Sequence, residues 1–229
     1  MIDENNYVDE ITHNIERHII RTLTVTSTAR FTQMRPPRVD SNLYAYHLKQ
    51  LIKLGYIIKN DRNYSLSPRG MKYADRFSLR YSRLVIQSKI TVGILLKNEF
   101  NEILLTKRYK HPFLDFWGLM LSKTYADDPS ILAAAQRTVF EEIKFPIIDM
   151  AHVGDCYVRT SIDGYEVSNI LSHIFYSEVK KAEISEAETV RWVSLNELTS
   201  IEPVPGAEDI INLVLKSKNH FFAELKYDL

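Results

Sequence analysis

The segment Arg137–Phe145 holds residues whose types and spacing suit metal-dependent chemistry. Arg137 is followed, four and five residues later, by the adjacent carboxylates Glu141 and Glu142. Carboxylate oxygens are the ligands that Mg²⁺ prefers, so such a pair can hold an ion beside a diphosphate. The arginine is spaced to pair with the first carboxylate on one helical face. The alternative is an ordinary solvated surface, because adjacent glutamates on a helix are usually exposed and surface ion pairs contribute little.

An α+β domain is predicted to position this motif. Buried strands are expected over residues 90–96 and 102–108, with a turn at 98–101. A helix capped by Asp128, with Pro129 at its first position, should run to about Ile143 and carry the motif. Further strands are expected near residues 153–158, 168–179 and 191–195, and a last helix at 207–216. Together these elements predict an α/β/α sandwich.

Composition restricts the class of protein. Hydrophobic residues make up 45% and charged residues 25% of the 229 residues, as in ordinary globular proteins. The single cysteine, Cys156, excludes an internal disulfide and a cysteine-rich zinc site. No apolar run approaches the ~20 residues of a membrane span, and the acidic N-terminus does not resemble a signal peptide. We therefore expect a cytoplasmic protein without a membrane partner.

Charge is distributed unevenly along the chain. The net charge is zero, but residues 21–80 hold 12 basic and 3 acidic residues, a balance of +9. Residues 1–80 carry +5 in total, and the remainder carries −5. This asymmetry predicts two domains, residues 1–80 and 88–229, of which the first has a polyanionic partner. A solvated basic face without a partner is the alternative.

The first domain is predicted to be mostly helical. Apolar spacing indicates a helix from about Asn6 to Leu23, and a short one from Thr28 to Gln33 that ends before Pro36-Pro37. Asp40 or Ser41 should cap a third helix, residues 42–54, which Gly55 terminates. A hairpin with its turn at residues 60–63 follows, and then a fourth helix opened by Ser67-Pro68.

The run DSNLYAYHLKQLIKLGYIIKNDRNYSLSPRG, residues 40–70, resembles the recognition helix and wing of bacterial winged helix-turn-helix regulators. This resemblance covers about the first 80 residues and implies binding to double-stranded DNA. Ala45, Leu48 and Ile52 should form the buried stripe of the third helix. The opposite face, expected to contact DNA, consists of Asn42, Tyr46, Lys49, Gln50 and Lys53. Arg62 at the wing tip is expected to contact phosphate or the minor groove. Alternatively, the lysines merely keep a surface helix soluble.

Residues 88–216 resemble the Nudix superfamily. The resemblance rests on the runs ILLTKR, FWG and ETVRWVSLNEL, and on the helix with an arginine and paired glutamates. Aligned on Arg137, the family's box G-x5-E-x7-R-E-U-x-E-E-x-G-U, in which U is a bulky apolar residue, spans Lys123–Phe145. The matching positions are Arg137, Val139, Glu141, Glu142 and Phe145. The departures are Lys123 and Lys144 in place of glycines, and Pro129 and Thr138 in place of glutamates.

The resemblance implies hydrolysis of a nucleoside diphosphate derivative with Mg²⁺ or Mn²⁺. Glu141 and Glu142 would be the metal ligands and Arg137 would orient them, which makes these three the catalytic residues if the site is active. Thr138 removes one carboxylate, so the metal should bind weakly or not at all. Glu166 or Asp163, in a later loop, would be the available substitutes.

Three functions fit the sequence. The first is a transcription regulator in which the winged helix binds DNA and the Nudix-like domain senses a nucleotide-type metabolite with little or no hydrolysis. It resembles Nudix-related regulators, although those usually place the winged helix after the Nudix domain; paired DNA-binding domains imply a homodimer. The second is an active Nudix hydrolase with an accessory domain, and the third is an interaction scaffold. The loss at Thr138, beside a segment of charge +9, favours the first.

Overall fold

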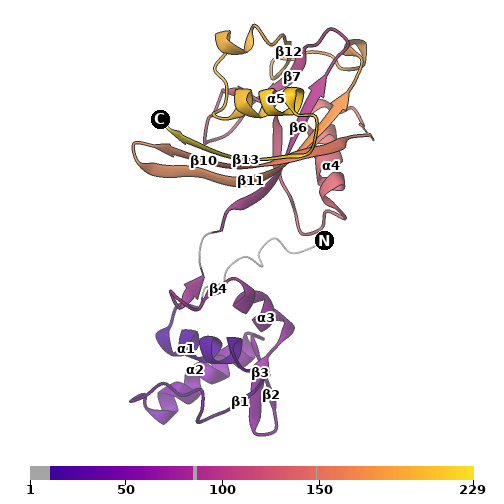
Figure 1. The fold of residues 1–229 in the computed structure, drawn as a ribbon. Coiled ribbons are helices and arrows are strands. Elements are labelled where there is room, and N and C mark those ends of the chain that lie inside the picture. Colours follow the sequence, from indigo (N-terminus) through magenta and orange to yellow (C-terminus); the bar gives the residue numbers. More distant parts are fainter. Residues whose placement is uncertain (1–10, 85–86, 148) are drawn as a thin grey trace. The chain divides into compact units, whose positions relative to one another are not determined.

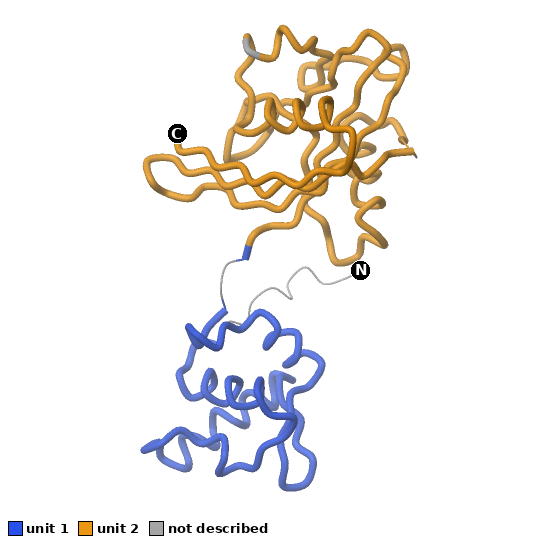
Figure 2. The backbone as a smooth tube through the Cα atoms, viewed as in Figure 1, with its two compact units in different colours: residues 1–87 blue, residues 88–229 orange. Residues whose placement is uncertain are grey.

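The chain divides between residues 87 and 88 into two units, shown in the computed structural model of Figure 2. Unit 1 comprises residues 1–87 and unit 2 comprises residues 88–229. The structure describes residues 11–84, 87–147 and 149–229. Each unit has buried core clusters of its own, so each is described separately.

Unit 1 packs helices against a small antiparallel sheet (Figure 1). Its helices are α1 (Asn14–Thr24), α2 (Ser41–Lys53) and α3 (Pro68–Asp75). Its strands are β1 (Ala29–Arg30), β2 (Ile57–Asn60), β3 (Asn63–Leu66), β4 (Phe77–Ser78) and β5 (Arg83–Leu84). β1, β3 and β2 form one sheet in that order, and β4 pairs with β5. The apolar face of α1, with Ile15, Ile19 and Leu23, packs on α2 and the β2–β3 hairpin.

Local sequence signals account for α2, the hairpin and α3. Asp40 caps α2 by accepting from the backbone N–H groups of Asn42 and Leu43 at 2.8 and 3.1 Å. Gly55 adopts φ +77° just after the helix, a conformation that favours glycine. Ser67 caps α3 by accepting from the N–H of Gly70 at 3.0 Å. These features confirm the predicted third helix, hairpin and fourth helix.

The predicted helix Thr28–Gln33 is wrong. Residues 29 and 30 form β1 instead, with Ala29 paired to Tyr64 and Arg30 to Asn63 of β3. The window before Pro36 is too short to nucleate a stable helix, and pairing with β3 buries Ala29. The first helix begins at Asn14 rather than Asn6, and residues 6–10 lie outside the described residues.

Unit 2 is built on one mixed sheet of strand order β12-β7-β6-β11-β10-β13. Two short strands lie outside this order: β8 pairs with β7, and β9 pairs with β6. The β6–β11 and β10–β13 pairs are parallel, and the other pairs of the sheet are antiparallel. The strands are β6 (Lys89–Lys97), β7 (Ile103–Lys107), β8 (Trp117–Gly118), β9 (Met120–Lys123), β10 (Ala151–Ile162), β11 (Tyr165–Glu178), β12 (Val190–Val193) and β13 (Phe221–Asp228).

Two helices of unit 2 cover opposite faces of this sheet (Figure 1). On β6, Val92, Ile94 and Leu96 pack in one core cluster with Ala135 and Val139 of α4 (Ile131–Ile143). Leu95, which points to the other face, packs with Ile211 of α5 (Ala207–Lys216). Because side chains alternate between the two faces of a strand, β6 contributes to a hydrophobic core on each face of the sheet. The mixed α/β architecture predicted for residues 88–229 is confirmed.

Several details of unit 2 differ from the sequence predictions. The N-cap of α4 is Ser130, whose Oγ accepts from the N–H of Ala133 at 3.1 Å, rather than Asp128 with Pro129 at the first position. β13 was not predicted, and it pairs in parallel with β10. β4 and β5 form a short hairpin where only a domain junction was expected. Among the helices of the described residues, none combines the length and apolar character needed to cross a membrane.

Candidate functional site

Arg137 on α4 is held by a bidentate ion pair with Asp128. Its Nε and Nη2 donate to the two carboxylate oxygens at 2.8 and 2.9 Å, and Nη2 also donates to the Lys123 carbonyl at 3.1 Å. The guanidinium lies 4.4 Å from the ring centroid of Tyr125. The hydrogen bonds from Arg137 lower the pKa of the Asp128 carboxyl, whose side chain is only 9% exposed. Sequence reasoning assigned Asp128 as a helix cap and missed this role.

The two glutamates of the motif lie in different environments. Glu141 is mostly exposed and accepts from Arg137 Nη1 at 3.3 Å, so the predicted Arg137–Glu141 pair is present. Glu142 is partly buried. Burial, and then the charge of Glu141, raise the pKa of Glu142, while Lys110, Arg108 and Lys144 oppose this increase. Of the two carboxylates, Glu141 is therefore paired and Glu142 lies near basic side chains.

Thr138, on the same helical turn, offers no ligand to this site. Its side chain is buried, at 1% exposure, and its Oγ1 donates to the Ala134 carbonyl at 2.8 Å within α4. Mg²⁺ in proteins needs an octahedral set of hard oxygen ligands and keeps them at short range. Two carboxylates, one of them engaged by arginine, are a poor set for it. The residues present do not fit the metal site that the family's box implies.

The C-terminal end of α4 shows a further departure from the family's box. Lys144 replaces a glycine and adopts the left-handed conformation, with φ +57°. A lysine in this region is strained relative to glycine. Its Nζ donates to the Glu141 carbonyl at 2.9 Å, which satisfies one orphan acceptor of the helix end. The side chain thus places a positive charge beside the motif.

The substitute carboxylates considered from the sequence lie away from α4. Glu166 is bound by Arg159, with N–O distances of 2.7 and 2.8 Å, and by Asn169 at 3.2 Å. Asp163 lies in the turn between β10 and β11, at φ +49°. Figure 1 shows this turn at the end of the hairpin remote from α4. Neither Asp163 nor Glu166 completes the Glu141–Glu142 pair.

The second candidate site is the exposed face of α2 in unit 1. Side chains predicted to contact DNA are exposed there: Asn42, Tyr46, Lys49 and Lys53, with Gln50 half-buried. The buried stripe is formed by Tyr44, His47, Leu48 and Leu51, while Ala45 and Ile52, predicted to be buried, are only half-buried. His47 is packed, with its ring centroid 3.7 Å from that of His13 and its Nδ1 2.9 Å from Glu16 Oε1.

The hairpin predicted to be the wing is formed by β2 and β3, residues 57–66. Arg62 lies exposed in its turn, beside Asp61 at φ +54°. A concave surface of about 360 Å³ adjoins the wing. Its lining residues are Arg30, Phe31, Thr32, Lys59, Asp61, Arg62 and Tyr64. Basic side chains therefore extend from the wing tip to β1.

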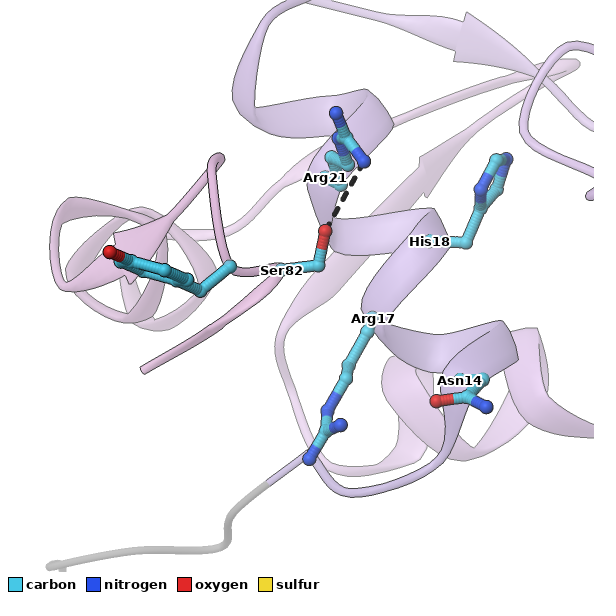
Figure 3. Close-up of a pocket in the computed structure, with 6 residues that line it drawn as sticks. Asn14, Arg17, His18, Arg21 and Ser82 are labelled. Carbon is cyan, nitrogen blue, oxygen red and sulfur yellow. Dashed lines mark hydrogen bonds between the residues drawn. The ribbon is translucent and has the colours of Figure 1, made fainter. Parts of the chain in front are cut away.

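A smaller cavity of about 250 Å³ lies between α1 and the β4–β5 turn (Figure 3). Asn14, Arg17, His18 and Arg21 form its α1 wall, and Tyr81 and Ser82 form the other. Arg21 Nη1 donates to Ser82 Oγ at 3.2 Å, which joins the two walls. Burial and the charge of Arg21 lower the pKa of His18, so the charge of this cavity comes from its arginines.

A third group of polar side chains was not found from the sequence. Within the described residues, His152, Asp155 and His173 place potential metal-ligand atoms within 4.8 Å of one another. The residues come from β10 and β11. Spacing along the chain gave no signal, because residues three apart in a regular strand point to opposite faces.

Comparison with known proteins places unit 2 in a family. The family model described as the NUDIX domain matches residues 87–214. None of the curated proteins matches the chain.

Among solved structures, a MutT protein from Bacillus halodurans is 18% identical with a TM-score of 0.50, covering 61% of this chain and 90% of its own. The NUDIX domain of Shewanella oneidensis NrtR, crystallised with ADP ribose, is 16% identical with a TM-score of 0.47, covering 64% and 96%. NrtR from the same organism, complexed with a 27mer DNA, is 19% identical with a TM-score of 0.46, covering 55% and 59%. At these identities the likeness concerns the fold alone. Because the family model spans more than half of the sequence, the chain belongs to the NUDIX domain family.

Proposed function

We propose that the protein is a DNA-binding transcription regulator whose NUDIX domain senses a nucleotide-type metabolite, with little or no hydrolase activity. The observation that carries the DNA-binding part is the exposed face of α2. It presents Tyr46, Lys49 and Lys53 on the side opposite the buried stripe, and Arg62 extends from the wing that follows α2.

The order of elements in unit 1 supports a winged-helix domain, with β1 in place of the short helix predicted before α2. α1, β1, α2 and the β2–β3 wing follow one another, and β1 completes a sheet with the wing. In this arrangement α2 corresponds to the helix that enters the major groove. Lysines and an amide side chain on such a helix can reach phosphates and base edges.

Electrostatics favour a polyanionic partner for this face. Lys49, Lys53 and Arg62 are exposed, and within the part of unit 1 that the structure describes they form no ion pair. Their charges therefore remain available to phosphates. Binding would release counterions, so affinity should fall steeply with salt. A homodimer would place two such helices on repeated half-sites.

The sensing role of unit 2 rests on the charges around α4. Glu142 lies near Arg108, Lys110 and Lys144, whose charges act on its pKa. With Thr138 in place of a carboxylate, this end of the helix is richer in positive charge than a magnesium site requires. Basic side chains can bind the phosphates of a nucleotide directly. The site is thus better suited to binding an anionic metabolite than to metal-assisted hydrolysis.

A metal-dependent hydrolase is the second candidate, and one observation favours it. Burial and Glu141 raise the pKa of Glu142. Raised carboxyl pKa values are typical of general bases in active sites. Partial burial without a catalytic role explains the same shift, because desolvation alone disfavours the charged form.

Steady-state hydrolysis separates the two candidates. The full chain would be assayed with ADP-ribose, dinucleotides, nucleotide sugars and nucleoside triphosphates, each with Mg²⁺ and with Mn²⁺. We expect no turnover above the uncatalysed rate, while calorimetry or a thermal shift detects binding of at least one of these compounds. Turnover that disappears in Glu142→Gln would establish the hydrolase and remove the pure sensor.

DNA binding is tested separately. Selection from a pool of random duplexes by the full chain should enrich a particular sequence. Unlabelled duplex of that sequence should then displace the labelled duplex from the protein. A chain that binds no duplex at low salt would contradict the role of unit 1, whatever the hydrolysis assay shows.

A further inference from the structure

Three histidines gather around Asp155 on the sheet of unit 2. His152 Nε2 and His173 Nδ1 lie 3.0 and 2.6 Å from Asp155 Oδ1. His220 Nε2 lies 3.6 Å from Asp155 Oδ2. The His152 ring centroid is 5.5 Å from that of His173 and 4.8 Å from that of His220. Three imidazole nitrogens therefore lie within 3.6 Å of one carboxylate.

An irregularity in β10 brings His152 to this group. The pairing of β10 with β11 shifts from His152↔Phe175 to Gly154↔Ile174, which leaves Val153 as an extra residue. Residues three apart in a regular strand face opposite ways, but a bulge restores them to the same face. Asp155 pairs directly with His173, so these two side chains also share that face. Bulges are over-represented beside functional sites.

Packing on the other side fixes the position of the group. A Cβ added to Gly154 would lie 2.6 Å from the ring of Phe221, so any larger residue would force this ring or β13 to shift. Gly154 pairs with Phe221, and His220 immediately precedes that residue. The His152 ring lies 5.2 Å from the buried ring of Phe175. Strand pairing and aromatic packing thus hold the donors before any ligand arrives.

The donors are also accessible. The side chains of Asp155 and His173 are 23% and 24% exposed, and those of His152 and His220 are 38% and 50% exposed. An ion can therefore enter from solvent without opening of the core. The competing explanation of this group is a set of histidine–aspartate hydrogen bonds without an ion. One histidine would be enough for such a hydrogen bond, whereas three imidazoles converge on Asp155 here.

We propose that His152, Asp155 and His173, with His220 as the fourth donor, form a binding site for a divalent transition-metal ion of the zinc class. Zinc ligands lie ~2.0–2.1 Å from the ion, so tetrahedral donors are roughly 3.3 Å apart. The N–O separations of 2.6 and 3.0 Å are hydrogen-bond distances, which an ion would lengthen towards this value, and that of His220, 3.6 Å, lies just above it. Imidazole nitrogens suit Zn²⁺, Co²⁺ or Ni²⁺, whereas Mg²⁺ prefers oxygen ligands.

An ion in this site would join three strands. Its ligands come from β10, from β11 and from the residue before β13. Binding would stabilise the docking of β13 on the sheet, because an ion that binds only the folded state raises stability. The site uses none of the residues of the Arg137–Glu142 motif, so the inference is independent of the proposed function.

Metal titration of the full chain tests this site. Protein stripped with a chelator would be titrated with Zn²⁺ by calorimetry and with Co²⁺ by visible absorption. We expect one Zn²⁺ per chain, Co²⁺ absorption bands of nitrogen–oxygen coordination, and no comparable binding of Mg²⁺. His152→Ala combined with His173→Ala should lower Zn²⁺ affinity by at least about 100-fold.

Controls separate the site from other metal-binding groups. His111→Ala removes an exposed histidine elsewhere in unit 2 and should leave Zn²⁺ binding unchanged, as should Glu141→Gln with Glu142→Gln. If the double histidine variant fails to fold, Asp155→Asn provides the second test. It preserves the shape of the side chain and should weaken Zn²⁺ binding. Absence of stoichiometric Zn²⁺ binding by the unmodified chain, or binding that survives in folded His152→Ala/His173→Ala, would overturn the proposal.

Discussion

The two units use their charged side chains in opposite ways. In unit 1 the basic residues of the α2 face and the wing, Lys49, Lys53 and Arg62, are exposed and form no ion pair within the described residues. In unit 2 several basic residues are engaged in ion pairs: Arg137 with Asp128, Arg159 with Glu166, and Lys181 with Glu102. Unpaired surface charge is available to a partner, whereas paired charge mainly supports the local structure.

The same contrast applies to the family motif on α4. Arg137 is kept, but its strongest contacts are with Asp128, and Thr138 is buried within α4. Arg137 and Thr138 therefore support the local structure of unit 2. The exposed polar side chains of α2 have no ion pair within the described residues, whereas the histidines around Asp155 contact its carboxylate.

The largest expected effect comes from restoring the missing carboxylate. Thr138→Glu would place a charge at a position that is 1% exposed, and we expect destabilisation by at least about 3 kcal/mol in urea unfolding. Thr138→Val, which removes only a hydroxyl bonded to its own helix, should cost less than about 1 kcal/mol. A stable Thr138→Glu variant with Mg²⁺-dependent turnover would mean that a metal ion can reach the motif on α4. That result would contradict the contrast drawn between the charged side chains of the two units.

Removing charge from the α2 face should weaken DNA binding. We expect Lys49→Ala with Lys53→Ala to lower affinity for duplex DNA about tenfold or more at low salt, because two phosphate contacts are lost. Lys216→Ala with Lys218→Ala removes the same charge from exposed positions of unit 2 and serves as the control. Fluorescence anisotropy measures both. Equal losses in the two double variants would show that only net charge matters.

The Asp128–Arg137 pair should stabilise unit 2. Asp128→Asn is expected to destabilise the fold by about 1–2 kcal/mol at neutral pH, since it breaks a bidentate charge-assisted pair. Because Arg137 lowers the pKa of Asp128 in the folded state, this contribution is present above the ordinary aspartate pKa and is lost as pH falls through the folded value. Unfolding at several pH values tests both statements.

The matched control for that pair is exposed. Glu166→Gln breaks the pair between Glu166, whose side chain is 39% exposed, and Arg159, whose side chain is 50% exposed. It should cost clearly less stability than Asp128→Asn, because solvent screens exposed pairs. A cost equal to that of Asp128→Asn would remove the distinction between the two pairs.

The smallest effect is expected at Glu142. Its pKa is raised by burial and by Glu141, so the ionised carboxylate costs stability at neutral pH. Glu142→Gln should be more stable by less than about 1 kcal/mol, because the side chain is partly solvated. The gain should disappear as pH falls below the ordinary glutamate value, where the carboxyl is protonated in both states. Thermal unfolding of this variant and of Glu141→Gln, which should show no gain, provides the check.

Local signals predicted much of the fold. Asp40, Gly55 and Ser67 fix the ends of α2 and α3 by contacts within a few residues, so their effect is visible in the sequence. β1 was missed because its pairing with β3 is not local, although that pairing outweighs the weak helical preference of residues 28–33. β13 alternates half-buried and exposed residues, and such alternation over eight residues is typical of a strand.

The sites were predicted less completely than the fold. Spacing alone predicted the Arg137–Glu141 pair, because four residues make one helical turn. The Asp128–Arg137 pair depends on how the chain approaches α4, and Ser130 rather than Asp128 begins that helix. The group around Asp155 depends on a bulge and on a strand more than sixty residues later, neither of which a spacing rule encodes.

The salt dependence of DNA binding tests the central claim most directly. Affinity of the full chain for duplex DNA would be measured over a series of salt concentrations, beside Lys49→Ala/Lys53→Ala. Each phosphate contact contributes about 0.9 to the slope of log affinity against log salt, so the variant should lose roughly 1.8 from a steep slope. An unchanged slope, or wild-type binding that does not respond to salt, would contradict the assignment of α2 as the DNA-binding helix.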